Sequence, residues 1–129
     1  MKSTLNLMED YYNWLKENYT IKAIDEDTDR ITTPFLDPLN DNICLYVIRN
    51  GDAIQISDDG YTLNNLAMMG INLIDTRDAL IREIIDRFGT SFIGDELTIS
   101  GRISGFPAMK FKLMASILQI NDLVFTNEE

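Results

Sequence analysis

The pair Asn50-Gly51 constrains the fold of this chain more than any other feature of its sequence. It separates Ile43–Arg49 from Asp52–Ser57, and both flanking segments are rich in β-forming residues. Asn-Gly is the strongest short-range signal for a two-residue β-hairpin loop, because a type I′ turn needs a positive φ at both loop positions. The pair therefore predicts a hairpin.

If Asn50 and Gly51 are the two loop residues, Arg49 pairs with Asp52, and the pairs Val47–Ile54 and Leu45–Ile56 follow. Side chains alternate between the two faces of a strand. One face of the hairpin is therefore expected to be apolar, formed by Ile43, Leu45, Val47, Ile54 and Ile56.

The same register predicts which polar segments meet at the open end of the hairpin. It places Ile43 opposite Asp58 and Asn42 opposite Asp59. The segment Asp37–Asp41, which directly precedes the hairpin, is then expected to lie beside Asp58 and Asp59.

Composition indicates a single soluble domain. The chain has 129 residues, 45% of them hydrophobic and 25% charged, which is ordinary for one globular domain with its own core. We expect one domain over residues 1–129, with a frayed tail at about 126–129. No apolar run approaches the roughly 18 residues of a membrane span. The N-terminus does not resemble a signal peptide, and Cys44 is the only cysteine, so a cytoplasmic location is expected and no membrane contact.

Charge and histidine content exclude several functions. The net charge is −10, from 21 acidic and 11 basic residues, and there is no histidine. Phosphate backbones are bound through Lys and Arg, so direct nucleic-acid binding is not expected. The missing histidine excludes Ser-His-Asp and Cys-His catalysis and histidine-ligated zinc. The acidity fits solubility, a basic protein partner, or imitation of the charge of a nucleic acid.

Hydrophobic periodicity predicts about four helices around a mainly antiparallel sheet of four to five strands, an α+β fold. The expected helices are Ser3–Tyr19, Leu63–Met69, a helix ending at Phe88, and Pro107–Asn121; the further strands are Ile21–Asp25, Arg30–Thr33 and Ser91–Ser100, the last as one strand or a short hairpin. The apolar stripe of the first helix is expected to pack on the sheet. The last helix is apolar on two sides, which predicts deep burial or a homodimer contact.

Several segments together resemble a known family. TTPFLDPLNDNICLYV, ISDDGYTLNNL and LIREIIDRFG are similar to the bacterial and prophage family known as domain of unknown function 1828. The leading YYNWLKENYTIK and the closing FPAMKFKLMASILQINDL fit the same pattern. The resemblance implies a small α+β protein of bacteria, phages and mobile elements. It implies no catalytic residues.

The acidic group at the open end of the hairpin, Asp37, Asp41, Asp58 and Asp59, allows two interpretations. Two carboxylates about 5 Å apart repel each other by roughly 3 kcal/mol at an effective dielectric constant of 20, so four together need an explanation. One is a divalent cation such as Mg²⁺, Ca²⁺ or Mn²⁺, for which these four residues are the candidate ligands. The other is structural: Asp59 caps the turn before Thr62, Asp37 organises the turn at Pro38, and the remaining side chains face water.

The leading hypothesis is a small acidic, non-enzymatic binding protein of bacteria or mobile elements, acting by stoichiometric contact with a protein partner. A sharper version is an inhibitor that imitates a nucleic acid and blocks a nucleic-acid-processing or defence enzyme. The alternative is a metal-dependent hydrolase or nuclease that uses the hairpin-end carboxylates. No catalytic residue and no required cofactor is assigned. The candidate partner contacts are Asp25, Glu26, Asp27, Asp29, Asp37, Asp41, Asp58 and Asp59.

Overall fold

The computed structural model describes residues 1–74 and 76–125. The expected frayed tail, 126–129, lies outside the described residues. The order of elements is α1 (Thr4–Asn18), β1 (Thr20–Ala23), β2 (Thr28–Leu36), β3 (Asn42–Asn50), β4 (Ala53–Ser57), α2 (Tyr61–Met68), α3 (Thr76–Phe88), β5 (Ser91–Ile93), β6 (Glu96–Arg102) and α4 (Phe106–Asn121). Short 3₁₀ turns precede and follow α4, at Ile103–Gly105 and Asp122–Phe125. The α+β prediction is confirmed, with six strands among the described residues because Ser91–Ser100 forms a hairpin.

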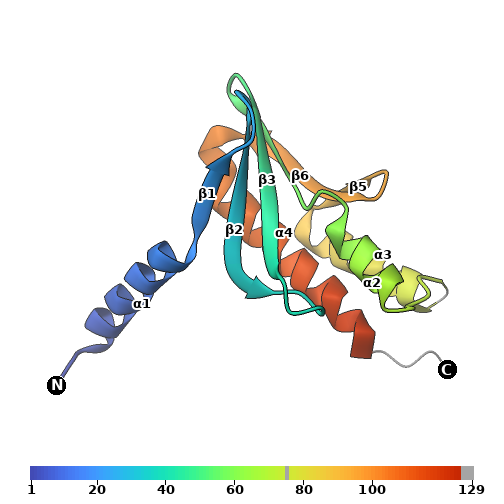
Figure 1. The fold of residues 1–129 in the computed structure, drawn as a ribbon, viewed down its shortest axis with the longest axis horizontal. Helices are drawn as coiled ribbons and strands as arrows, with labels where there is room; N and C mark the ends of the chain where they lie inside the picture. The colour runs from blue at the N-terminus through green and yellow to red at the C-terminus, as the bar shows by residue number, and fades with distance from the viewer. Residues whose placement is uncertain (75, 126–129) are drawn as a thin grey trace.

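The strands form one sheet in the order β1-β2-β3-β4-β6-β5, with every neighbouring pair antiparallel. Helices α2, α3 and α4 lie together on one side of this sheet, whereas α1 extends away from it at the other end of the molecule (Figure 1). The N-terminus is at the far tip of α1.

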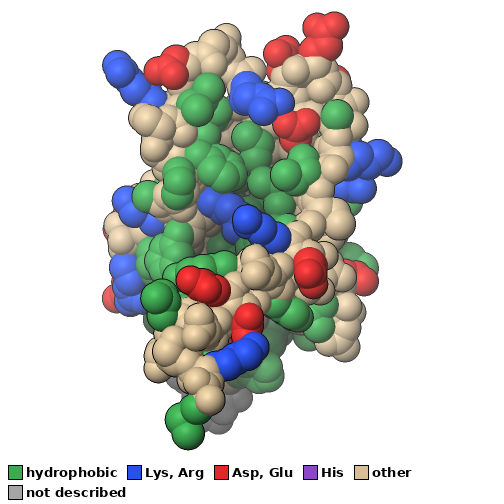
Figure 2. All heavy atoms as spheres, turned by 90° about the vertical axis from the view of Figure 1, so that its left-hand side faces the viewer, with side chains coloured by type: hydrophobic (Ala, Val, Ile, Leu, Met, Phe, Trp, Pro, Cys, Tyr) green, Lys and Arg blue, Asp and Glu red, His purple; other side chains and the backbone are tan. Residues whose placement is uncertain are grey.

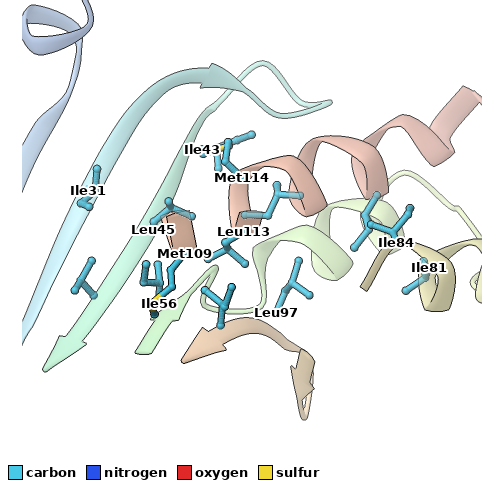
Figure 3. Packing of buried hydrophobic residues seen from close by; sticks show 14 of the residues in the cluster. Ile31, Ile43, Leu45, Ile56, Ile81, Ile84, Leu97, Met109, Leu113 and Met114 are labelled. Carbon is cyan, nitrogen blue, oxygen red and sulfur yellow. The ribbon is translucent and has the colours of Figure 1, made fainter. Parts of the chain in front are cut away.

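The core lies between the sheet and α4. Leu45, Ile56 and Leu97 on the strands and Leu113 and Ile120 on α4 have no exposed surface. The side chains of the strands and of Leu113 point toward one another across the interface, and Ile81 and Ile84 of α3 extend the cluster beyond α4 (Figure 3). The two-sided apolarity of α4 is therefore explained in large part by burial, against the sheet on one side and α3 on the other.

The central hairpin is present, but its register differs from the predicted one. Asn50 pairs with Ala53 and Val47 pairs with Ile56, so the two loop residues are Gly51 and Asp52. Only Gly51 has a positive φ, +61°, which is the φ pattern of a type II′ turn with glycine first. The difference from the predicted pairing is an even number of residues. The apolar face therefore has the predicted members, all of them buried.

The expectation that the first helix packs on the sheet is wrong. Ser3 caps α1 by accepting the N–H of Asn6, as its sequence predicts, yet α1 has no buried residue. Only the end of α1 contacts the rest of the protein. Leu15 and Tyr19 are half-buried, and the Tyr19 hydroxyl accepts a hydrogen bond from Lys110 Nζ at 2.7 Å. The stripe that predicted the helix is real, but the sheet does not cover it.

Candidate functional site

A cavity of about 360 Å³ lies where β3 continues past the end of β4. Ser57, the last residue of β4, pairs with Tyr46, and the chain then leaves the sheet and enters α2. The loop before β3, the first half of β3, α2 and the end of α4 all contribute to the lining. This volume is within the range of small-molecule sites in proteins, about 300–1,000 Å³.

The predicted meeting of the acidic segments is only partly realised. Asp37, Asp41 and Asp58 all line this cavity. They meet because α2 folds back beside the start of β3, and not through the predicted pairing of Asp58 with Ile43, which the observed register excludes. Asp59 has an exposed side chain and a left-handed backbone, with φ of 59°.

Asp58 is a structural residue of the fold. It is only 1% exposed, and its two carboxylate oxygens accept three backbone N–H groups: those of Gly60 at 2.8 Å, Thr62 at 3.0 Å and Leu97 at 2.8 Å. The prediction that Asp59 caps this turn is therefore wrong, because Asp58 accepts the N–H groups at the start of α2. A partner protein does not reach Asp58 while the domain is folded.

Asp37 organises the preceding loop, as the structural interpretation expected. Its Oδ1 accepts the N–H groups of Leu39 at 2.8 Å and Asp41 at 3.1 Å. Its Oδ2 accepts Nδ2 of Asn65 at 3.0 Å, which joins the loop to α2. The carboxylate thus fixes the position of the loop over the cavity.

Metal binding by this acidic group finds no geometric support. Within residues 1–74 and 76–125, no three Cys, Asp or Glu side chains are grouped so that they could hold a metal ion. The carboxylates of Asp37 and Asp58 already accept three N–H groups each. A cation would have to compete with those donors.

Arg30 and Tyr46 form the sheet side of the cavity. The two residues are paired across β2 and β3, so their side chains lie on the same face of the sheet. Burial raises the pKa of Tyr46 above 10.0; the Arg30 hydrogen bond opposes that shift, and the charge of Asp59 and the neighbouring Tyr61 add to it. Arg30 Nε is itself buried, and no acceptor within the described part of the chain reaches it.

Asn121, the last residue of α4, also lines the cavity. The residue is 6% exposed, and its Oδ1 is buried with no donor among the described residues. The sequence analysis missed Arg30, Asn65, Tyr46 and Asn121. A signal existed for Asn121, because it follows Leu113 and Ile117 at intervals of four on the buried face of α4, where a polar residue is unusual.

The second acidic group lies in and beside the β1–β2 turn, at the end of β2 away from Asp37 and Asp41. Asp25 Oδ1 accepts the N–H groups of Asp27 at 2.9 Å and Thr28 at 2.8 Å, so it shapes the turn. Asp29 is paired with Arg49 at 2.6 Å. Glu26 is exposed. The eight candidate contacts therefore form two groups and not one surface.

The sequence predicts that the apolar stripe of α1 packs on the sheet, but in the structure α1 has no buried residue. Its exposed large side chains are Leu5, Leu7, Met8, Tyr11, Tyr12 and Trp14. Viewed from the side on which α1 lies, hydrophobic side chains are interspersed with charged ones over the whole face (Figure 2).

Residues 33–120 match the model of one protein family, described as Domain of unknown function DUF1828. The chain belongs to this family. The match starts within β2 and ends within α4, so it contains most of the sheet and core, while α1 and β1 precede it. It is shorter than the resemblance inferred from the sequence, which included the segment from Tyr11.

No curated protein and no solved structure matches the chain. None of the described helices is long and apolar enough to cross a membrane.

Proposed function

We propose that this protein is a small acidic, non-enzymatic binding protein that contacts a basic protein partner in a stoichiometric complex. The observation that carries this proposal is the exposed apolar face of α1. Leu5 is 68% exposed, Tyr12 53% and Trp14 50%, on a helix with no buried residue. Several large apolar side chains exposed on one helix are typical of an interaction site on a soluble protein.

The position of α1 supports the same proposal. The helix precedes the region matched by the family model and extends away from the sheet (Figure 1). A partner can therefore enclose much of it without disturbing the core. Trp and Tyr are the residues that most often dominate binding energy at protein interfaces.

Charge supports a basic partner. The chain carries a net charge of −10, and complementary charge raises association rates and disfavours other acidic proteins.

The cytoplasm is the proposed location, and bacteria or their phages the proposed source, as the family resemblance implies. The sharper version, an inhibitor that imitates a nucleic acid, requires that the partner be a nucleic-acid-processing enzyme. Nucleic acid would then compete with this protein for the same basic surface.

The test is purification of a complex and not capture alone. Tagged wild-type protein is incubated with bacterial lysate, and any recovered partner is purified and titrated by calorimetry. The proposal expects a basic partner, a fixed stoichiometry, and affinity that falls as salt rises. Binding that is indifferent to salt, or no recovered partner, would contradict it. Competition by DNA or RNA separates imitation of nucleic acid from simple contact.

Two variants test whether the exposed face of α1 is the surface that binds the partner. Trp14→Ala removes an aromatic side chain from α1 and is expected to weaken partner binding by about tenfold or more. Phe111→Ala is the matched control, because Phe111 is an aromatic residue of α4 that is 73% exposed.

Light scattering tests the homodimer directly. If the wild type has twice the monomer mass and Trp14→Ala has the monomer mass, α1 mediates self-association, and the basic-partner proposal is overturned.

A further inference from the structure

We infer that the cavity between β3, α2 and α4 binds a small, uncharged, planar molecule that carries both a hydrogen-bond donor and a hydrogen-bond acceptor, of the lactam or nucleobase class. This site is separate from α1 and does not depend on the partner proposal. Four features carry the inference: an unpaired acceptor, an unpaired donor, apolar and aromatic walls, and a charge that disfavours anions.

The unpaired acceptor is Asn121 Oδ1. Buried polar groups in folded proteins nearly always have a hydrogen-bond partner, so each exception needs an explanation. Asn121 is 94% enclosed and lines the cavity, and no donor in the described part of the chain reaches its Oδ1. An N–H group of a bound molecule would satisfy it.

The unpaired donor is Nε of Arg30, from the sheet side of the same cavity. Arg30 lies on the same face of the sheet as Tyr46, because the two residues are paired across β2 and β3. A carbonyl or ring-nitrogen acceptor would satisfy Nε. A molecule that carries both an N–H and a C=O would satisfy both unpaired atoms, whereas a hydrocarbon would satisfy neither.

The remaining walls favour a flat, uncharged molecule. Ile43 and Ile117 contribute apolar surface, and the rings of Tyr46 and Tyr61 also line the space. Aromatic rings bind flat heterocycles by offset stacking. The carboxylates of Asp37, Asp41 and Asp58 in the same lining outnumber the one cation, Arg30, so phosphate and carboxylate groups would be repelled.

The test uses three related probes. Uracil has both N–H donors and C=O acceptors, 1,3-dimethyluracil lacks the N–H donors, and uridine monophosphate adds a ribose and an anionic phosphate while keeping the N3–H. Saturable chemical-shift changes in amide NMR spectra report binding. We expect uracil to shift amides around the cavity at up to about 10 mM, and the other two probes to bind at least about tenfold more weakly.

Variants of the two residues complete the test. Asn121→Leu is expected to abolish the uracil-induced shifts and to raise the melting temperature of the free protein, because it removes an unpaired buried acceptor. Asn13→Leu, an amide replacement on exposed α1, is the matched control. Should Asn121→Leu not fold, Arg30→Lys removes the Nε donor while keeping the charge. Binding of uracil by Asn121→Leu at wild-type strength, tighter binding of the monophosphate, or no saturable binding by any probe would overturn the inference.

Discussion

Asp58 and Leu97 bond to each other twice, although 39 residues separate them. The N–H of Asp58 donates to the Leu97 carbonyl at 3.1 Å, and the N–H of Leu97 donates to Asp58 Oδ1 at 2.8 Å. The first bond extends the pairing of β4 and β6 beyond Ser57. The second, with the bonds from Gly60 and Thr62, holds the start of α2 against β6. One buried carboxylate thus joins three elements and forms part of the cavity wall.

Replacement of Asp58 is expected to destabilise the whole domain. Asp58→Ala leaves three N–H groups without their acceptor, and each unsatisfied buried group costs about 1–3 kcal/mol. We expect the free energy of unfolding, measured with urea, to fall by about 3 kcal/mol or more. Asp59→Asn is the control: it keeps an exposed residue tolerant of the left-handed backbone and should change stability by about 0.5 kcal/mol or less. A small effect of Asp58→Ala would show that the carboxylate is not structural.

The observed type II′ turn and the predicted type I′ turn give different expectations for Asn50 but the same one for Gly51. In the observed turn only Gly51 has a positive φ, and no atom lies within 4 Å of an added Cβ. Gly51→Ala is therefore expected to cost about 1–2 kcal/mol through backbone strain alone. Asn50 is a paired strand residue, so Asn50→Ala should cost about 0.5 kcal/mol or less. Equal losses in urea denaturation would instead indicate the type I′ turn.

The same hairpin shows what a single sequence can and cannot predict. The alternation of Leu45, Val47, Ile54 and Ile56 identifies the core face whichever turn forms, because a shift of two residues preserves the face. The turn type depends on the twist that the other strands impose, and that information is not local. The error mattered at the open end, where it changed which residues oppose Asp58.

Other features depend on tertiary contacts that no local pattern encodes. Amphipathicity shows that α1 has an apolar face but does not identify what covers that face. For this reason the prediction that α1 packs on the sheet is wrong. Asp58 and Asp59 are adjacent and chemically identical. Only the three-dimensional position of Leu97 makes the first a buried acceptor and leaves the second exposed.

Divalent cations are expected to have little effect on stability. A metal that binds the native state raises the melting temperature by mass action. Because the oxygens of Asp37 and Asp58 accept N–H groups and the described residues contain no group of three ligands, we expect Mg²⁺, Mn²⁺ and Ca²⁺ at millimolar concentration to leave the melting temperature unchanged within about 1 °C. A rise that Asp59→Asn abolishes would favour the metal-dependent hydrolase.

Changes on the exposed face of α1 should not alter folding. The combined variant Leu5→Ser, Tyr12→Ser and Trp14→Ser replaces side chains that are at least half exposed, so the free energy of unfolding is expected to change by about 1 kcal/mol or less. Leu113→Ala is the contrast: Leu113 is fully buried, and such truncations cost about 2–5 kcal/mol. A large loss from the α1 variant would mean that the helix packs on the domain in solution.

Stability at alkaline pH should carry a contribution from Tyr46. Its pKa is raised above 10.0, first by burial and then by the nearby charge of Asp59, with the Arg30 hydrogen bond acting in the opposite direction. The folded state therefore keeps a proton that the unfolded chain loses near pH 10. The sign follows from linkage: where the folded state binds more protons than the unfolded state, stability falls as pH rises. The contribution is constant below the unfolded pKa and is lost as pH increases through the folded pKa.

Tyr46→Phe isolates this contribution, because phenylalanine does not ionise. Urea denaturation of both proteins from about pH 8 to about pH 11 is expected to give a constant difference in unfolding free energy at the lower values. Above about pH 10 the wild type should lose stability more steeply than Tyr46→Phe. Other tyrosines and lysines titrate in both proteins, so their effect cancels in the difference. A difference that stays constant across the range would show that the Tyr46 phenol titrates alike in the folded and unfolded states, and that its burial against Arg30 is not maintained in solution.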